Sequence, residues 1–337
     1  MKTYIERVLM HKDLTTDEME EASRLLFSDT TDERQKAAFL TALRSKGEAV
    51  SELTGLAKVM REVAVKLPRN LPDVMDNCGT GGDGSQSFNI STTSAFVLAG
   101  AGMTVAKHGN RSISSQTGSA DVLEELGVHL SATPEGMSDL LEKNRIAFLF
   151  APNVHPAMKH VMPVRKALGI PTIFNLIGPL TNPAALTTQL IGVYREDVLM
   201  DVGNVLHKLG RKRAVVVHGA GGLDEASLAG TNHCILVTEE GLTAFDLSPE
   251  DVGLETVDNS ALKGGNAREN AVILRSVLEG GKGPHRDVVL LNAGLGLLAS
   301  GKAQTPEEGV RLAEESIDSG AALERLNYLV AYRKESA

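Results

Sequence analysis

Apolar residues recur with a helical period in the first part of the chain. From Ala49 onward they are spaced to form one face of a helix: Val50, Leu53, Leu56, Ala57, Met60, Val63 and Ala64. A threonine three residues before a glutamate, the pattern of a capping box, occurs at Thr15–Glu18 and again at Thr30–Glu33. The pattern predicts an all-helical domain over residues 1–70, which ends in the proline-containing segment 67–72.

A different pattern follows, in which short apolar runs alternate with helical segments. We expect strands at 74–76, 104–106, 146–150, 190–193, 214–217, 234–237 and 288–291. Helices are expected near 92–100, 121–126, 135–144, 156–168, 197–209 and 268–279, and again from Pro306 onward. Such alternation is typical of an α/β fold with a central, largely parallel sheet flanked by helices. The sequence therefore predicts a small helical domain followed by a large α/β domain over residues 73–337.

A glycine-rich segment follows the first expected strand. Gly79, Gly81 and Gly84 match the dinucleotide fingerprint G-x-G-x-x-G. That fingerprint requires an acidic residue about 20 residues further on, but the chain has no Asp or Glu between Gly84 and Ala120. We therefore reject an NAD site. The density of glycines beside Asp83 exceeds what a tight turn needs, and it indicates a loop whose N–H groups hold an anion.

The same acid-free window concentrates cations. The segment 107–115 contains three basic residues, Lys107, His108 and Arg111, together with several hydroxyl and amide donors. An isolated basic loop is usually only solvated, but the missing acids and the serines favour a phosphate site. The segment 89–94 leads into a helix and is a candidate N-terminal cap, which would direct a helix N-terminus at the anion. Ser119 is a candidate cap for the next helix and a further phosphate contact.

Composition and charge limit the possible functions. The chain has 337 residues and a net charge of −9, whereas nonspecific nucleic-acid binders are usually basic. Its two cysteines cannot form a disulfide framework or a zinc cluster. No apolar run approaches the ~18–20 residues that a membrane span needs, and the first residues lack a secretory pattern. We expect a cytoplasmic protein that binds neither nucleic acid nor membrane.

Adjacent carboxylates at Asp224 and Glu225 lie in a glycine-rich segment just after an expected strand. An exposed acidic turn is the simpler interpretation. However, neighbouring carboxylates at a strand end repel each other unless a cation separates them. Mg²⁺ commonly takes one or two carboxylates together with substrate phosphates. The neighbouring phosphate loops therefore favour a magnesium site.

Six segments occur in an order that resembles the anthranilate phosphoribosyltransferase family. They are GTGGDG, NIST, KHGNRSISS, GSADVLEELG, HPAMKHVMPVRKALG and NLIGPLTNP, which begin at residues 79, 89, 107, 118, 155 and 175. The resemblance covers essentially the whole chain. It implies the second step of tryptophan synthesis from chorismate, in which 5-phosphoribosyl 1-diphosphate (PRPP) and anthranilate give N-(5-phosphoribosyl)anthranilate and pyrophosphate. It also implies that helices near 156–180 return to the helical domain, which carries a homodimer interface.

The resemblance also assigns roles to residues. It implies that anthranilate meets Gly79, Asn110, His155 and Arg165, and that Asp224 and Glu225 hold two Mg²⁺ ions, with Ser91 on one of them. Lys107 and His108 are candidates for stabilising the leaving group and orienting the amine; we find no clear general base. The implied PRPP contacts are Gly79, Gly82, Asp83, Ser87, Asn89, Ile90, Ser91, Thr92, Lys107, His108, Gly109, Asn110, Arg111, Ser112, Ile113, Ser114, Ser115 and Ser119.

Two departures and two alternatives remain. Ser85-Gln86-Ser87 replaces what is often Ser-Gly-Thr, and Gln116 stands where lysine is common. A pyrimidine nucleoside phosphorylase shares the implied fold, but its resemblance around Lys107 is shorter. A non-catalytic nucleic-acid-binding relative should be basic and should lack the metal carboxylates, unlike this acidic chain.

Overall fold

The computed structural model describes residues 1–112 and 117–332, and it begins with four helices. These are α1 (Lys2–Leu9), α2 (Thr16–Leu26), α3 (Glu33–Lys46) and α4 (Val50–Val63). The capping box at Thr15 and Glu18 is confirmed. The second predicted box is wrong, because Asp32 caps α3 by accepting the backbone N–H of Arg34. Asp32 directly precedes the helix, whereas the Thr30 hydroxyl pairs with that of Ser28.

A seven-stranded sheet forms the centre of the α/β part, in the order β3-β2-β1-β4-β5-β6-β7. The strands are β1 (Val74–Asn77), β2 (Thr104–Gly109), β3 (Ile146–Phe150), β4 (Thr188–Gly192), β5 (Arg213–His218), β6 (Asn232–Thr238) and β7 (Gly241–Leu247). The first five strands run parallel, and β6 and β7 are antiparallel. The predicted α/β architecture with a largely parallel sheet is therefore confirmed.

One predicted strand is wrong, and one strand was not predicted. Residues 288–291 lie inside α13 (Pro284–Ser300), and β7 was not predicted. The helix is buried along most of its length, so its apolar run continues around the helix and imitates a buried strand. The exposed edge strand β7 carries few buried side chains and therefore no apolar run.

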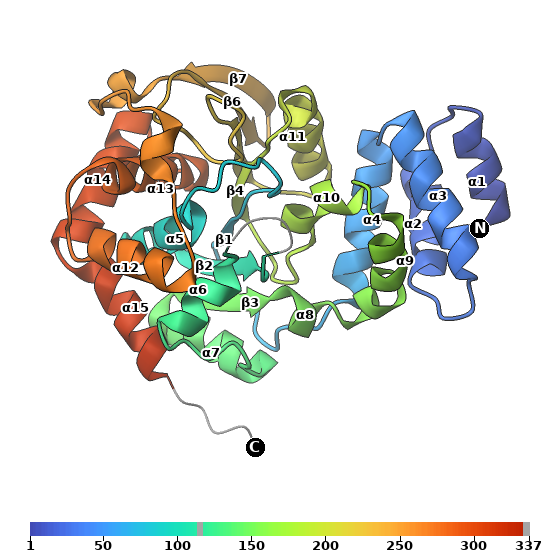
Figure 1. Ribbon diagram of the computed structural model, residues 1–337, viewed down its shortest axis with the longest axis horizontal. Coiled ribbons are helices and arrows are strands. Elements are labelled where there is room, and N and C mark those ends of the chain that lie inside the picture. Colours follow the sequence, from blue (N-terminus) through green and yellow to red (C-terminus); the bar gives the residue numbers. More distant parts are fainter. Residues whose placement is uncertain (113–116, 333–337) are drawn as a thin grey trace.

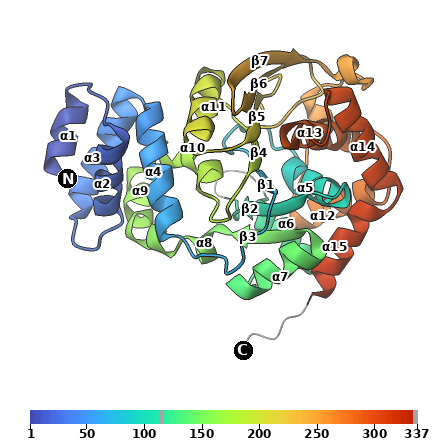
Figure 2. The same ribbon diagram turned by 180° about the vertical axis from the view of Figure 1, so that it is seen from behind.

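Helices cover both faces of the sheet. On one face lie α5 (Ile90–Gly100) and α13, and on the other lies α11 (Leu199–Lys208). Figure 2 shows the same layers from behind. The remaining helices are α6 (Ser119–Glu125), α7 (Pro134–Asn144), α8 (Ala151–Val154), η1 (Pro156–His160), α9 (Met162–Leu168), α10 (Phe174–Ile177), η2 (Gly178–Thr181), η3 (Glu196–Val198), η4 (Pro249–Val252), η5 (Asn259–Leu262), α12 (Ala267–Leu278), α14 (Pro306–Asp318) and α15 (Ala321–Ala331). Among the described residues, no helix is both long and apolar enough to span a membrane.

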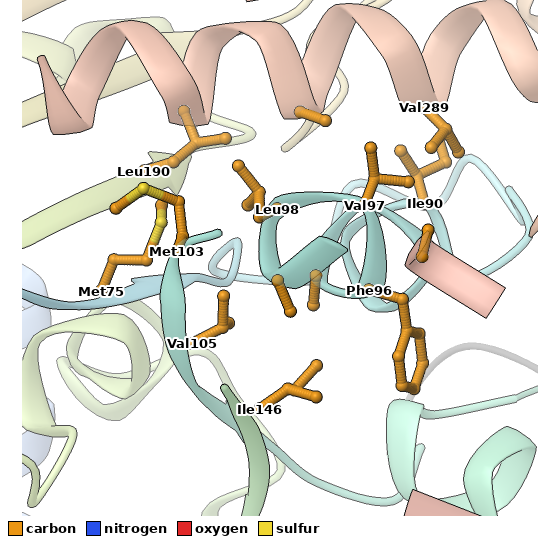
Figure 3. Close-up of a cluster of buried hydrophobic side chains, with 14 of the residues drawn as sticks. Met75, Ile90, Phe96, Val97, Leu98, Met103, Val105, Ile146, Leu190 and Val289 are labelled. Carbon is orange, nitrogen blue, oxygen red and sulfur yellow. The ribbon is translucent and has the colours of Figure 1, made fainter. Parts of the chain in front are cut away.

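The larger hydrophobic core lies between the sheet and α5 and α13. Figure 3 shows Val289 of α13 beside Val97 and Ile90 of α5, and Met75 of β1 beside Met103, within one cluster of buried side chains. The interior of α5 is apolar nearly all round, because the sheet, α13 and α15 enclose it. This core fixes the N-terminal end of α5 against the carboxyl end of β1.

A second core joins the N-terminal helices to the middle of the chain. It combines buried residues of α2, α3 and α4 with Val161, Ile173 and Leu180. It also includes Val205 of α11 and Val216 of β5, and so reaches the second face of the sheet. Figure 1 shows α9 and α10, in green, beside the blue helices. The helical part therefore consists of two stretches of chain and packs on the sheet through α11.

Candidate active site

The glycine loop after β1 packs directly on the acidic pair. The N–H of Gly81 donates to Asp224 Oδ2 at 2.6 Å. A Cβ atom at Gly79 would lie 2.2 Å from the same oxygen, and one at Gly192 would lie 1.6 Å from the Asp224 carbonyl oxygen. Because neither distance is sterically possible, both glycines are required for the loop, β4 and Asp224 to meet.

The two carboxylates are crowded and poorly solvated. Burial raises the pKa of Asp224 well above its ordinary value, and the charges of Glu225 and Asp83 raise it further. Burial also raises the pKa of Glu225, although Lys107 and Ser91 partly oppose this shift. The protein therefore brings three acidic side chains towards one position with one nearby lysine to balance them.

This donor set suits Mg²⁺. Carboxylate oxygens are the hard ligands that the ion prefers, and an incomplete protein shell leaves room for water and phosphate. Ser91, at the start of α5, donates its N–H to Glu225 Oε1 at 3.2 Å, so its hydroxyl lies in the same neighbourhood. A divalent cation would stabilise the charged carboxylates and reverse their raised pKa values. The residues present thus fit the ion.

A second acidic group nearby does not offer a free metal site. Asp76, Cys78 and His108 place ligand atoms within 4.8 Å of one another. However, Asp76 already accepts hydrogen bonds from Asn182 Nδ2 at 2.9 Å and from the His108 N–H at 3.2 Å. Burial also raises its pKa, which disfavours the charged form. These contacts indicate a structural role for Asp76.

The N-terminus of α5 borders the loop, as predicted. Asn89 is the N-cap residue, but its side chain donates to the Thr117 carbonyl and accepts from Asn270 instead of capping the helix. The side chain of Ile90 lies in the large core and that of Thr92 is buried. Ile90 can therefore meet a ligand only through its backbone.

The end of β2 delivers a buried cation and a pair of histidines. Lys107 is 3% exposed and donates to the Asn77 carbonyl at 3.2 Å. The rings of His108 and His155 meet edge to face, with centroids 5.1 Å apart. Burial lowers the pKa of His108 to about 4 and that of His155 to about 3, so both are neutral near pH 7. Their Nε2 atoms have no partner among the described residues.

The segment after β2 folds back onto the start of α6. Ser119 donates to the Asn110 carbonyl at 3.2 Å, and the Ser112 N–H donates to Asp121 at 3.1 Å. Ser119 is the first helical residue and Gly118 holds the N-cap position, so the predicted cap is displaced by one residue. A Cβ atom at Gly109 would lie 2.3 Å from Ser119 Oγ, so only glycine fits this position. Its predicted ligand contact is therefore through the backbone. Ile113, Ser114, Ser115 and Gln116 lie outside the described residues.

Three predicted residues are engaged elsewhere. Arg111 pairs with Asp121 and Glu124 of α6 and lies over the Phe150 ring. Ser87 forms an isolated bridge with Lys263. Arg165 on α9 lies over the Phe174 ring at 5.1 Å, and burial lowers its pKa. Arg165 thus belongs to the helical side of the molecule.

Two asparagines that the sequence analysis did not single out support the site. Asn182 also donates to the Ala106 carbonyl, so it ties β1 and β2 to the segment after η2. Asn292 of α13 accepts the N–H of Ala226 and donates to its carbonyl, next to Glu225. Only the NLIGPLTNP motif, which contains Asn182, could have signalled either of them.

Comparison with known proteins defines the class first. Residues 2–64 match the helical bundle domain of a glycosyl transferase family, and residues 71–323 match the α/β domain of that family. A buried lysine, a glycine loop and acidic side chains at the carboxyl edge of a parallel sheet are consistent with a glycosyl transferase that handles phosphates.

The particular family follows from full-length relatives. Anthranilate phosphoribosyltransferases of Exiguobacterium sibiricum and Listeria welshimeri are each 57% identical, over 100% and 99% of this chain and 99% of each relative. The crystal structure of the Thermus thermophilus enzyme has a TM-score of 0.92 at 43% identity and covers 97% of this chain and 98% of its own. The Saccharomyces cerevisiae enzyme in complex with PRPP and Mg has a TM-score of 0.89 at 30% identity, over 97% and 96% of the two chains. The chain belongs to the anthranilate phosphoribosyltransferase family.

Proposed function

We propose that the chain transfers the phosphoribosyl group of PRPP to the amine of anthranilate at the carboxyl ends of β1, β2 and β5. The products are N-(5-phosphoribosyl)anthranilate and pyrophosphate. The observation that carries this proposal is the direct contact between the glycine loop and Asp224, with Lys107 beside Glu225. A diphosphate and its metal would satisfy both the loop and the carboxylates.

PRPP is proposed to lie along the glycine loop, the start of α5 and the segment after β2. Loop N–H groups and the α5 N-terminus favour the diphosphate, since both present partial positive charge. The proposed contacts are Gly79, Gly82, Asp83, Ser87, Asn89, Ile90, Ser91, Thr92, Lys107, His108, Gly109, Asn110, Arg111, Ser112, Ile113, Ser114, Ser115 and Ser119. For Arg111 this requires exchange of its exposed ion pairs for phosphate, which costs little in water.

The chemical difficulty is breakage of the C1–O bond, because negative charge then builds on the departing pyrophosphate. Lys107 is held in place by Asn77 and offers a fixed charge near that position. Mg²⁺, when held by Ser91, Asp224 and Glu225, supplies further positive charge to the diphosphate. The anthranilate nitrogen forms the new bond to C1 and then loses a proton. A neutral aromatic amine needs no strong base, and binding alone aligns it with C1.

Anthranilate is proposed to meet Gly79, Asn110, His155 and Arg165. Within the described residues no carboxylate forms an ion pair with Arg165. Among those residues its guanidinium contacts only the Phe174 ring and Met162 Sδ, so we propose that it takes the substrate carboxylate in a bidentate contact. The neutral His108–His155 pair provides an uncharged wall for an aromatic ring. The Saccharomyces cerevisiae relative is known in complex with 4-fluoroanthranilate, which supports this substrate class.

Three broader features complete the proposal. We propose two Mg²⁺ ions per subunit, since three acidic groups border the site. We propose a homodimer through the helical part, formed by residues 1–70 and the helices near 156–180, where Leu9 and Met10 are 63% and 68% exposed. We also propose a cytoplasmic location, because the free cysteines Cys78 and Cys234 suit a reducing compartment.

A direct assay tests the function. Purified protein is mixed with PRPP, Mg²⁺ and anthranilate, and the loss of anthranilate fluorescence is followed. We expect loss that requires both PRPP and metal, so omission of PRPP or addition of EDTA should abolish it. A chain that instead cleaves thymidine with phosphate would contradict the proposal.

A further inference from the structure

A cavity of about 360 Å³ lies at the amino-terminal end of β1. The candidate active site lies at the carboxyl end of the same strand. It is bounded by the end of α4, the segment 66–71 and residues 183–185, with Val74 at the start of β1 and Leu141 of α7 in its wall. The glycine loop follows the other end of β1. Because the cavity touches both α4 and the α/β part, a ligand there would bridge the two.

The lining is cationic although the chain as a whole is acidic. Lys58, Arg61, Lys66 and Arg69 line the cavity, against one acidic residue, Glu62. Several of these charged residues form ion pairs with residues that do not line the cavity. Lys58 pairs with Glu20 at 3.2 Å, Arg69 pairs with Asp139 at 3.0 Å, and Glu62 pairs with Arg24 at 2.8 Å.

Two of these cations have no acidic partner, although the exposed side chain of Lys66 donates to the Arg61 carbonyl oxygen. Across residues 1–112 and 117–332, no carboxylate forms an ion pair with Arg61 or Lys66. Burial lowers the pKa of Arg61, and no nearby acid offsets that shift. A half-buried guanidinium without a counter-charge is unfavourable, because no electrostatic attraction offsets the free-energy cost of removing it from water.

A third cation lies behind the cavity wall. Arg211 is 3% exposed, and it donates to Gln189 Oε1 at 3.0 Å and to the Leu186 carbonyl, next to the lining residues 183–185. Its Nη2 atom has no partner among the described residues. Burial lowers the pKa of Arg211 to about 9, and the charge of Arg61 contributes to that shift.

The nearest compensation for Arg211 is incomplete. The charge of Asp76 partly opposes the lowering of the Arg211 pKa. However, the Asp76 oxygens already accept hydrogen bonds from Asn182 and from backbone N–H groups. The two guanidinium groups therefore repel each other, and among the described residues neither forms an ion pair with a carboxylate, although Asp76 partly opposes the shift of Arg211. A counter-anion in the cavity would remove this repulsion.

We propose that this cavity is a second anion site, which binds a compact dianion of the phosphate class through Arg61 and Lys66, with Arg211 behind them. Guanidinium groups bind phosphate oxygens in bidentate fashion, and a dianion matches the excess of cations. The volume is near the lower end of the ~300–1,000 Å³ typical of small-molecule sites. A phosphate monoester would thus fit as well as free phosphate. The site differs from that proposed for PRPP, at the opposite edge of the sheet.

Isothermal titration at constant ionic strength tests the proposal, with inorganic phosphate in one arm and glycerol 3-phosphate in the other. We expect the wild-type chain to show a class of sites that Arg61→Gln weakens at least about tenfold, the loss of one strong charged contact. The control is Arg44→Gln, which removes an equal charge from α3 outside the cavity. Tighter binding of the ester than of phosphate would identify the monoester as the ligand, and the reverse would identify free phosphate.

Crystals soaked in selenate locate the anion independently, because the selenium scatters anomalously. A peak within hydrogen-bond distance of Arg61 supports the site, whereas peaks confined to the glycine loop overturn it. Identical isotherms for the wild-type chain and Arg61→Gln also overturn it. Anthranilate consumption by the wild-type chain is unaffected by that outcome, so the two proposals fail separately.

A stability control excludes misfolding. Without added anion, Arg61→Gln should melt at or above the wild-type temperature, because it relieves repulsion with Arg211. Lys66→Gln, in the segment after α4, provides a second variant with a smaller structural role. Both variants should respond less than the wild-type chain when phosphate raises the melting temperature. An equal response in all three would contradict the proposal.

Discussion

At the scale of residues, the site depends on charges that the protein leaves only partly compensated. Asp224 and Glu225 are adjacent, half-buried and close to Asp83, and Lys107 is the cation that opposes the shift of Glu225. Their raised pKa values mean that protons compete with metal for the same oxygens. Metal binding should therefore strengthen as the pH rises.

The double variant Asp224→Asn, Glu225→Gln tests this role. We expect an apparent affinity for Mg²⁺ at least about tenfold weaker, because both hard ligands are lost. The measurement is the rate of anthranilate consumption against Mg²⁺ concentration at pH 6 and pH 8. Glu239→Gln, at an exposed position between β6 and β7, is the matched control. An unchanged Mg²⁺ titration would remove the pair from the metal site.

The variant Arg165→Ala tests the proposed acceptor contact. Loss of a bidentate charged contact is expected to raise KM for anthranilate about 10- to 100-fold. The KM for PRPP should change little, because Arg165 lies on α9 over Phe174. Steady-state kinetics with each substrate varied in turn measure both constants. Equal increases in the two would contradict the assignment.

The buried histidines predict a pH dependence of stability. Their folded pKa values, about 4 for His108 and about 3 for His155, lie below the ordinary value of 6.5. Between these values the unfolded chain binds protons that the folded chain does not, so stability is complete above pH 6.5 and falls as the pH falls. Each imidazole contributes a slope of up to about 1.4 kcal/mol per pH unit.

Urea unfolding between pH 7 and pH 4.5 measures that slope. His155→Asn should make it shallower, since one of the two titrating groups is gone. His129→Asn, a solvent-exposed substitution after α6, should leave it as in the wild-type chain. A slope that is the same in all three proteins would refute the role of His155.

Residue types and spacing pointed to segments that the structure brings together, but they did not predict the contacts between them. The acid-free window and the glycine loop both border the site. Each is a continuous segment of the chain, so its residue types can be recognised from the sequence alone. The alternative partners of Arg111 are on α6, which folds back in space, and so composition could not anticipate them. Asp76 was likewise unremarkable in sequence, because its role depends on Asn182, far along the chain.

At the scale of elements, α13 both supports the sheet and contacts the segment that carries the proposed metal ligands. Asn292 is 1% exposed and holds both backbone polar groups of Ala226, beside Glu225. The apolar run that surrounds it predicted a strand at 288–291, and the structure shows a helix. Period alone cannot separate a helix that is buried all round from a buried strand.

The variant Asn292→Ala removes both hydrogen bonds to Ala226. We expect a loss of about 2–4 kcal/mol in the free energy of unfolding, because a buried N–H and a buried C=O lose their partners. The affinity for Mg²⁺ should also fall, whereas a merely structural role would leave it unchanged in the folded fraction. Urea denaturation and an Mg²⁺ titration of activity measure the two effects.

At the scale of the whole molecule, the α/β architecture followed from the alternation of apolar runs and helical segments. The edge strand β7 did not, because it buries too little to carry a pattern. The contact of α11 with α4 could not be read from the sequence either, since it joins segments far apart in the chain. Because of this long-range packing, we expect that the helical part does not fold independently.

The fragment 1–64 tests this dependence. In the full chain its core is completed by Val161, Ile173 and Leu180, all 0% exposed. Without them the fragment exposes a large apolar face, so we expect weak helical circular dichroism and no cooperative thermal transition. The full-length chain provides the comparison. A sharp transition in the isolated fragment would show that α1–α4 fold alone.

The second core, which joins α2–α4 to residues from 161 to 237, also bears on how the chain is made. On the ribosome, the first four helices emerge long before α9, α10 and α11 exist. They must wait, with their apolar faces uncovered, until roughly two thirds of the protein has been synthesised. During vectorial synthesis the N-terminal helices therefore come out first but complete their packing late, which leaves their apolar faces exposed to aggregation in the meantime.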